Sequence, residues 1–259
     1  MPKRQYIDNK FGQLHLRVSQ PQNHSARAVL CIHISPLSGV VYKEVLKELG
    51  SDRLVIAPDT PGYGMSDAPL NAPSIQDYAD SMIELIEELQ LKELDLIGYG
   101  TGSKIAFETA LKKPEKIKHL ILISAPDYTP KEIALMNNSL GRTIEPKDDG
   151  SHLLHLWKQV SGFKSLNTRM RMFSEHIRAG KRKPWGPRAA FAFQYRDKID
   201  SLLTPLLILN ISNEITAPTK RLKTKIKVGK YLERLDWQHG FLETYAAEFS
   251  GIVRNFTST

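Results

Sequence analysis

The sequence predicts an α/β protein in which a mostly parallel, doubly wound sheet carries an N-terminal antiparallel hairpin and an inserted helical cap. Short apolar segments alternate with segments of helical periodicity up to residue 125, the alternation stops over residues 126–201, and it then resumes. Such alternation is typical of parallel crossovers. With 259 residues, 41% of them hydrophobic and 25% charged, the chain has the composition of one large globular core.

Each predicted element follows from a local pattern. Strict alternation over Gln13–Val18 indicates the second strand of the hairpin, continuous apolar segments indicate buried strands, and apolar residues recurring on one face indicate helices. The other expected strands are Ala28–Ile32, Leu54–Ala57, Leu94–Ile97, Lys118–Ser124, Leu206–Leu209 and Tyr231–Leu235. The expected helices are Val41–Leu49, Ile75–Leu89 with Ser74 as its cap, Ser103–Lys112 and Phe241–Phe256.

The segment that breaks the alternation is rich in aromatic, histidine and cationic residues. We interpret residues 126–201 as a helical cap inserted into a single domain whose core comprises residues 1–125 and 202–259. The aromatic side chains of the cap are expected to form mostly its own core, with some facing an apolar substrate cavity.

The decisive motif is Gly98-Tyr99-Gly100-Thr101-Gly102, where a predicted strand runs into a predicted helix. A phosphate-binding loop is the rival interpretation, but the third glycine does not have the spacing of a dinucleotide fingerprint, and the Lys-Ser/Thr pair of a P-loop is missing. The motif resembles a nucleophile elbow, in which flanking glycines permit a crowded turn and the central residue is strained. Here the centre is Gly100, which has no side chain, so ordinary serine-hydrolase chemistry is excluded.

Four further segments extend this resemblance in the same chain order. They are His33-Ile34-Ser35-Pro36 after the first parallel strand, Asp59–Asp67 with the pattern Asp-x-Pro-Gly-x-Gly-x-Ser-Asp, Leu206–Pro218, and Trp237–Phe241. Together they resemble the α/β-hydrolase superfamily over about residues 10–125 and 203–256. The resemblance is strongest to cap-bearing members such as epoxide hydrolases, haloalkane dehalogenases and carbon–carbon bond hydrolases.

The resemblance implies roles for five residues besides Gly100, which stands at the nucleophile position. His239 takes the place of the general base, and Glu214 takes the place of the acid that orients it, with Asp127 as the alternative acid. The backbone N–H groups of Thr101 and Ser35 take the places of the oxyanion-hole donors. The superfamily usually has glycine after the histidine, so Ile34 departs from its pattern, and a β-branched residue restricts the loop that carries Ser35. A loop histidine and a surface carboxylate without these roles remain the plainer interpretations of His239 and Glu214.

Several nearby side chains are candidates for contact with a small-molecule substrate. These predicted substrate-binding residues are Tyr99, His33, Trp157 and Trp237. The hydroxyl groups of Ser35, Thr101 and Ser103 are candidates to replace the missing nucleophile, although capping and turn roles are the plainer use of each.

Other function classes find little support. The apolar runs, such as Leu120–Ile123, are far shorter than the roughly 18 residues of a membrane span, so we expect no membrane partner. No secretory signal is visible, and we therefore expect a cytoplasmic protein.

The single cysteine, Cys31, lies in a predicted buried strand and is expected to be structural. The net charge is +8, and Lys181–Lys183 and Lys220–Lys230 are locally basic, but neither stretch has a nucleic-acid-reading motif. A solvated surface is the expected role of these cations, and an anionic substrate is the alternative. His152 and His155 lack a third ligand at motif spacing, so no metal and no cofactor are expected; the oligomeric state is not specified.

The sequence thus predicts an atypical hydrolase that acts on a small carbonyl or ester-like substrate, with His239 activating water directly. Addition or elimination next to a carbonyl is compatible with the same residues. Two alternatives stay open: a noncatalytic ligand-binding member of the fold, and an engineered variant of an ordinary hydrolase in which glycine replaces the nucleophile.

Overall fold

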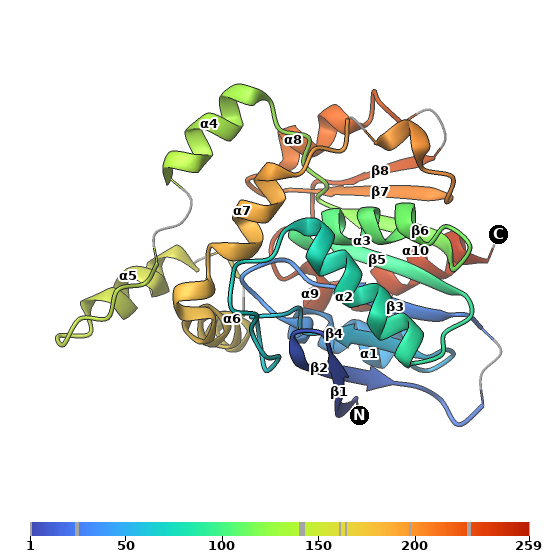
Figure 1. Ribbon diagram of the computed structural model, residues 1–259, viewed down its shortest axis with the longest axis horizontal. Helices are drawn as coiled ribbons and strands as arrows, with labels where there is room; N and C mark the ends of the chain where they lie inside the picture. The colour runs from blue at the N-terminus through green and yellow to red at the C-terminus, as the bar shows by residue number, and fades with distance from the viewer. Residues whose placement is uncertain are drawn as a thin grey trace.

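A twisted eight-stranded sheet forms the centre of the computed structural model, which describes residues 2–23, 26–139, 143–160, 162–163, 165–196, 198–226 and 229–258 (Figure 1). The strands are β1 (Lys3–Asn9), β2 (Gly12–Ser19), β3 (Ala28–Ile32), β4 (Val55–Pro58), β5 (Leu94–Tyr99), β6 (Ile117–Ile123), β7 (Leu206–Ile211) and β8 (Lys230–Arg234). Their spatial order is β1-β2-β4-β3-β5-β6-β7-β8.

The pairing confirms the predicted mostly parallel sheet with an N-terminal hairpin. β1 pairs with β2, and β2 with β4, in antiparallel fashion, whereas every pairing from β4 to β8 is parallel. Because parallel strands end at the same edge, the residues that follow β3, β5, β6 and β7 meet there. This edge holds the candidate site.

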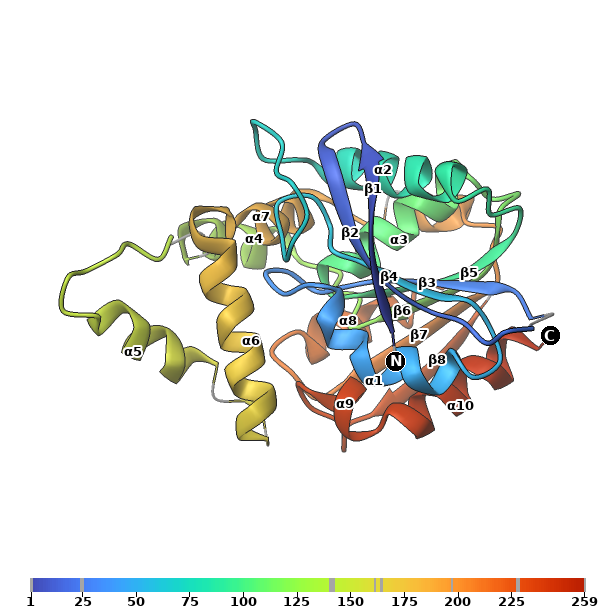
Figure 2. The ribbon, with the colours of Figure 1, turned by 90° about the horizontal axis from the view of Figure 1, so that it is seen from below.

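Helices cover both faces of the sheet (Figure 2). The α-helices are α1 (Lys43–Leu49), α2 (Ile75–Glu88), α3 (Thr101–Lys112), α4 (Pro130–Ser139), α5 (Ser151–Gln159), α6 (Leu166–Ala179), α7 (Trp185–Ala192), α8 (Thr216–Leu222), α9 (Phe241–Thr244) and α10 (Ala246–Thr257). Short 3₁₀ turns occur at η1 (Gly39–Tyr42), η2 (Gly180–Arg182) and η3 (Ile199–Ser201). Side chains of α2 and α3 pack into one buried apolar layer, and those of α1 and α10 into another on the opposite face.

The clearest predicted helix, α2, begins as its capping residues require. The Ser74 hydroxyl accepts a hydrogen bond from the Asp77 N–H, and the Asp77 carboxylate accepts one from the Ser74 N–H at 2.9 Å. This reciprocal capping box satisfies two helix-terminal donors.

Several expected boundaries differ from the structure, and two of the differences have a clear physical reason. The expected strand Leu94–Ile97 continues through Gly98 and Tyr99, because these residues pair with β6 and prolong the strand to the turn. The expected single helix Phe241–Phe256 is broken at Tyr245, whose φ and ψ of −121° and 33° separate α9 from α10.

The segment between β6 and β7 contains α4, α5, α6 and α7 and lies beyond the carboxyl edge of the sheet (Figure 1). We call it the β6–β7 segment. In Figure 1, α7 lies against the sheet domain and α5 lies farthest from it. Lys104 of α3 is fully buried and donates hydrogen bonds at 2.7 Å to the carbonyl oxygens of Ala190 and Phe193, at the end of α7. These bonds attach α7 to the core.

Candidate functional site: a strained glycine elbow beneath a cavity

The turn between β5 and α3 has the geometry of an elbow. Gly100 has φ 57° and ψ −113°, a combination that glycine adopts at low cost and other residues adopt only under strain. The flanking glycines are required by close approach, since a Cβ on Gly98 would lie 2.2 Å from the Gly102 carbonyl oxygen and one on Gly102 would lie 2.3 Å from the Ile32 carbonyl oxygen. The three glycines together permit the sharp strand-to-helix turn.

The side chain of Ile34 occupies the space in which any side chain at position 100 would begin. A Cβ built on Gly100 would lie 2.6 Å from Cγ1 and 2.7 Å from Cδ1 of Ile34. Real Cβ atoms do not approach carbon atoms this closely, so a nucleophile at position 100 would require Ile34 to move. The two departures from the superfamily pattern, Gly100 and Ile34, are therefore packed against each other.

His33 is fully buried and fixes the loop that carries Ile34. Its Nδ1 donates to the Ile34 carbonyl oxygen at 3.0 Å, and its Nε2 accepts from the Thr60 N–H at 2.9 Å. This pair of bonds selects the neutral Nδ1–H tautomer. Burial lowers the pKa of His33 to about 4, against a smaller opposing effect of Asp59. His33 holds the loop in place and is not among the residues that line the cavity described next.

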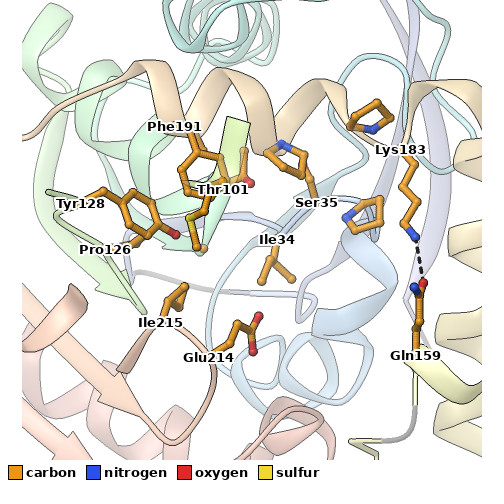
Figure 3. A pocket seen from close by; sticks show the side chains of 16 residues that line it. Ile34, Ser35, Thr101, Pro126, Tyr128, Gln159, Lys183, Phe191, Glu214 and Ile215 are labelled. Atoms are coloured by element: carbon orange, nitrogen blue, oxygen red, sulfur yellow. Dashed lines mark hydrogen bonds between the residues drawn. The ribbon is translucent and has the colours of Figure 1, made fainter. Parts of the chain in front are cut away.

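A cavity of about 400 Å³ lies between the elbow and the β6–β7 segment (Figure 3). Its lining residues are Ile34, Ser35, Pro36, Gly100, Thr101, Pro126, Tyr128, Met136, Gln159, Lys183, Pro184, Pro187, Ala190, Phe191, Glu214 and Ile215. We call it the elbow cavity. Most of its walls are apolar or aromatic, and the charged side chains among these residues are Lys183 and Glu214. A site of this kind fits a small, largely apolar molecule.

Ser35 and Thr101, the two predicted oxyanion-hole donors, both line the elbow cavity (Figure 3). Thr101 is the first residue of α3, so its N–H has no acceptor within the helix and lies at the positive end of the helix dipole. The hydroxyl of Ser103, by contrast, is buried and bonded to the Gly100 carbonyl oxygen at 2.5 Å and to the Tyr195 hydroxyl at 2.7 Å. Ser103 therefore has a structural hydrogen-bonding role.

His239 and Glu214 lie together at the carboxyl edge. His239 Nε2 is 2.7 Å from Oε2 of Glu214, and its Nδ1 is 3.1 Å from the Tyr99 hydroxyl. Partial burial raises the pKa of Glu214, but the hydrogen bond and the charge interaction with His239 outweigh it, so the net effect is a lowered pKa. Glu214 is thus an ionised acceptor for the imidazole.

The ring of His239 does not line the elbow cavity. It lines, with Tyr99 and Phe163, a separate cavity of about 20 Å³, too small for more than a water molecule. Glu214 lines the elbow cavity, and both ring nitrogens of His239 are engaged in the contacts given above. In this arrangement the imidazole is linked to the elbow cavity by its hydrogen bond to Glu214, which lines that cavity.

Asp127, the alternative acid, lies in a different environment. Its carboxylate is buried and accepts from Lys225 at 2.7 Å and from Arg196 at 3.3 Å. These ion pairs occupy both oxygens, and the contact to His239 is made by Glu214. The Asp127 carboxylate therefore joins Arg196 of the β6–β7 segment to Lys225, which follows α8.

The two predicted tryptophan contacts pack elsewhere. Trp157 lies edge-on to Phe173 at 5.3 Å and beneath the Arg169 guanidinium at 3.9 Å. Trp237 is fully buried and stacks on Phe241 and Tyr245. Neither is among the residues that line the elbow cavity.

The histidine pair of the β6–β7 segment makes local contacts. His152 Nδ1 accepts from the Lys147 N–H at 3.1 Å, and His155 Nε2 lies 3.1 Å from the Gln159 amide nitrogen. Over the described ranges, no cluster of three or more His, Cys, Asp and Glu side chains is arranged to hold a metal ion. None of the helices in those ranges has both the length and the apolar content needed to span a bilayer.

Sequence reasoning missed two lysines. Lys104 follows Gly100 by one helical turn, which places it on the side of α3 that faces the β6–β7 segment, and burial lowers its pKa to about 7. Lys183 lies in the basic stretch Lys181-Arg182-Lys183, whose charge pattern favours a solvated surface, yet Lys183 lines the elbow cavity.

The parallel sheet, the strained elbow and the histidine–acid pair that follows in chain order define a protein of the α/β-hydrolase class. Residues 27–230 match the family model described as alpha/beta hydrolase fold, and the chain belongs to this family.

Relatives of known sequence match only parts of the chain. A 2-hydroxymuconate semialdehyde hydrolase of Pseudomonas sp. (strain CF600) is 33% identical over 85 residues, which are 32% of this chain and 30% of the relative. A cis-3-alkyl-4-alkyloxetan-2-one decarboxylase of Shewanella oneidensis is 26% identical over 154 residues, which are 55% of this chain and 47% of the relative. The chain thus spans about a third to a half of the length of these relatives.

Solved structures match over nearly the whole chain. An enol-lactonase of Burkholderia xenovorans LB400 has a TM-score of 0.79 at 17% identity, covering 98% of this chain and 100% of its own. A serine-to-glycine mutant of an N-acyl homoserine lactonase, complexed with N-hexanoyl homoserine lactone, has a TM-score of 0.78 at 20% identity and covers 99% of both chains. At these identities the likeness shows the fold.

Proposed function

We propose that this protein binds a small, largely apolar molecule through a carbonyl or carboxyl oxygen in the elbow cavity, without forming a covalent bond to it. The observation that carries the proposal is the position of Ile34, whose side chain fills the space of the elbow side chain. A covalent step at Gly100 has neither a nucleophilic atom nor room for one.

The N–H groups of Ser35 and Thr101 supply the polar recognition. Both residues line the cavity at the elbow, and donors of this type bind a partial negative charge on oxygen whether or not a reaction follows. The apolar walls, including Ile34, Phe191 and Ile215, would bury the remainder of the ligand.

The names of the similar proteins agree with a carbonyl ligand. They include an enol-lactonase, a 2-hydroxymuconate semialdehyde hydrolase, and a lactonase crystallised with an acyl lactone in a serine-to-glycine form. Each acts on or holds a molecule with a carbonyl group, which supports the same ligand class for the elbow cavity.

A second candidate function is hydrolysis by water that His239 activates. The contact of 2.7 Å between His239 and Glu214 favours it, because a carboxylate in this position orients an imidazole and stabilises its protonated form. The imidazole would have to leave the Tyr99 hydroxyl and turn a nitrogen toward the elbow cavity for this reaction.

The two candidates are separated by measuring binding and turnover together. Hexanoyl esters, thioesters, lactones and epoxides are tested with the wild type, His239→Ala and the double variant Gly100→Ser/Ile34→Ala. We expect saturable binding by the wild type with no turnover above the His239→Ala level. Turnover that disappears in His239→Ala would instead establish the second candidate, and absence of binding by every ligand would refute the leading one.

A further inference from the structure

The elbow cavity contains one cation without an internal counterion. Lys183 lines the cavity, and its Nζ lies 3.4 Å from the amide oxygen of Gln159. Among the residues that the structure describes, no carboxylate lies within ion-pair distance of Lys183, whereas Glu214, the cavity's acidic residue, is bonded to His239. A partly buried ammonium group with one neutral acceptor retains capacity for an anion.

The backbone around Lys183 is held by the core, whereas its ammonium group contacts Gln159 of α5 in the outer part of the β6–β7 segment. The hydroxyl of Tyr63, a residue of the loop after β4, accepts from the Gly186 N–H at 2.6 Å and donates to the Arg182 carbonyl oxygen at 3.2 Å. The Arg182 guanidinium in turn donates to the Gly62 carbonyl oxygen at 3.0 Å. The backbone on both sides of Lys183 is therefore attached to the sheet domain, which makes its position a fixed feature of the cavity.

The two polar features of the cavity are spatially separate. In Figure 3, Lys183 and Gln159 lie on one side of the cavity, Tyr128 and Pro126 lie on the other, and Ser35 lies between. A ligand whose carbonyl oxygen is held by the amides at the elbow therefore has a cation within the same cavity, displaced from the elbow. The Glu214 carboxylate disfavours an anion on its own side, which directs a ligand's negative charge toward Lys183.

We propose that the ligand of the elbow cavity is an oxo-carboxylate, a molecule with a carbonyl group at the elbow and an apolar linker ending in a carboxylate that pairs with Lys183. This inference rests on the proposed function and adds the charge of the ligand to it. Partial burial lowers the pKa of Lys183, and a counterion would favour its charged form.

The test is a calorimetric titration at pH 6.5 with a series of ω-1 oxo-carboxylates, from 4-oxopentanoate to 7-oxooctanoate, and with the primary amides of the same acids. The amide keeps the shape and the ketone but removes the negative charge. We expect one chain length to bind best and to bind roughly 10- to 100-fold more tightly as the acid than as the amide.

Three variants test whether Lys183 causes this preference. Lys183→Met removes the charge and keeps most of the apolar stem, and we expect it to abolish the preference by weakening the acid while the amide is unchanged. Lys183→Arg keeps a cation and should retain the preference, and Lys181→Met removes an exposed neighbouring cation that does not line the cavity. Unchanged thermal unfolding of each variant shows that the fold is intact.

The outcomes separate this inference from the proposed function. If acid and amide bind equally, or if Lys183→Met weakens both alike, the assignment of Lys183 is wrong while ligand binding at the elbow stands. If neither acid nor amide binds at any chain length, the proposed function fails and the inference fails with it. An equal loss in Lys181→Met would also overturn the assignment, because it would indicate a general surface-charge effect.

Discussion

The side chain of Ile34 and the backbone of Gly100 occupy one another's space at the elbow: a Cβ on Gly100 would lie 2.6 Å from Cγ1 of Ile34. Both residues depart from the superfamily pattern. The side chain of Ile34 fits beside the elbow because Gly100 has no side chain. The loop that carries Ile34 is held by buried His33, so the backbone of Ile34 is fixed beside the elbow. The absence of a side chain at position 100 and the packing of Ile34 against it are therefore expected to be coupled.

Restoring a serine at the elbow tests this coupling. Gly100→Ser places a side chain at positive φ and against Ile34, so we expect it to lower the free energy of unfolding by about 2 kcal/mol or more. In Gly100→Ser/Ile34→Ala the clash is relieved, and the double variant should be more stable than the sum of the single effects by about 1 kcal/mol or more. Urea unfolding of the four proteins gives the coupling energy, and additive effects would show that the two residues are independent.

The buried imidazole of His33 makes stability depend on pH. Its pKa of about 4 in the folded protein lies below the ordinary value of 6.5, so the unfolded chain binds more protons between these values. Stability is then lost as the pH falls from 6.5 to 4, by on the order of 3 kcal/mol. His33→Gln should remove this contribution, whereas His155→Gln, at an exposed position, should leave it. Denaturant unfolding between pH 4 and 7 measures the difference, and equal slopes for wild type and His33→Gln would contradict it.

The buried Lys104 makes the stability of the folded protein depend on pH above neutrality. Burial lowers its pKa to about 7 from 10.5, with nearby Asp127 opposing and Arg196 reinforcing the effect. The unfolded chain therefore binds more protons than the folded protein between these values, so stability should rise with pH. From pH 7 to 9.5 we expect a rise of roughly 2–3 kcal/mol that is missing in Lys104→Met. Denaturant unfolding at both pH values measures it, and a rise of the same size in Lys104→Met would show that other groups are responsible.

The hydroxyl of Tyr63 anchors the turn that carries Lys183. Tyr63→Phe leaves the Gly186 N–H without its acceptor at 2.6 Å, and a buried donor left unpaired costs about 1–3 kcal/mol. We expect lower stability together with weaker binding in the elbow cavity, because the η2–α7 turn loses its attachment. The exposed Tyr6 provides the matched control, Tyr6→Phe. Thermal unfolding and ligand titration check both effects; the loss of stability without any change in binding would separate the turn from the cavity.

Much of the fold was predictable because each strand carries its own pattern. The continuous apolar segments of β3 and β4 are typical of strands that are buried on both faces of a parallel sheet. The boundaries were less predictable. Gly98 and Tyr99 look like the start of a turn in isolation, and only their pairing with β6 makes them part of the strand.

The site was predictable in its parts but not in its assembly. The motif around Gly100 and the segment around His239 both have local signatures. The sequence could not show that Ile34 fills the elbow, because that contact joins residues 66 positions apart through a loop whose conformation depends on His33 and Thr60. Nor could it show that Lys183 faces a cavity, since a cation in a basic stretch is ordinarily solvated.

The central claim is that a carbonyl oxygen is held without a covalent bond by the amides of Thr101 and Ser35. It is tested most directly by following the backbone amide signals in nuclear magnetic resonance spectra during titration with an oxo-carboxylate and with its hydroxy analogue, which lacks the carbonyl group. We predict that the signals of Thr101 and Ser35 shift saturably and reversibly with the ketone and much less with the alcohol. If these two signals stay in place while the ligand binds elsewhere, or if the protein gains the mass of the ligand, the claim is contradicted.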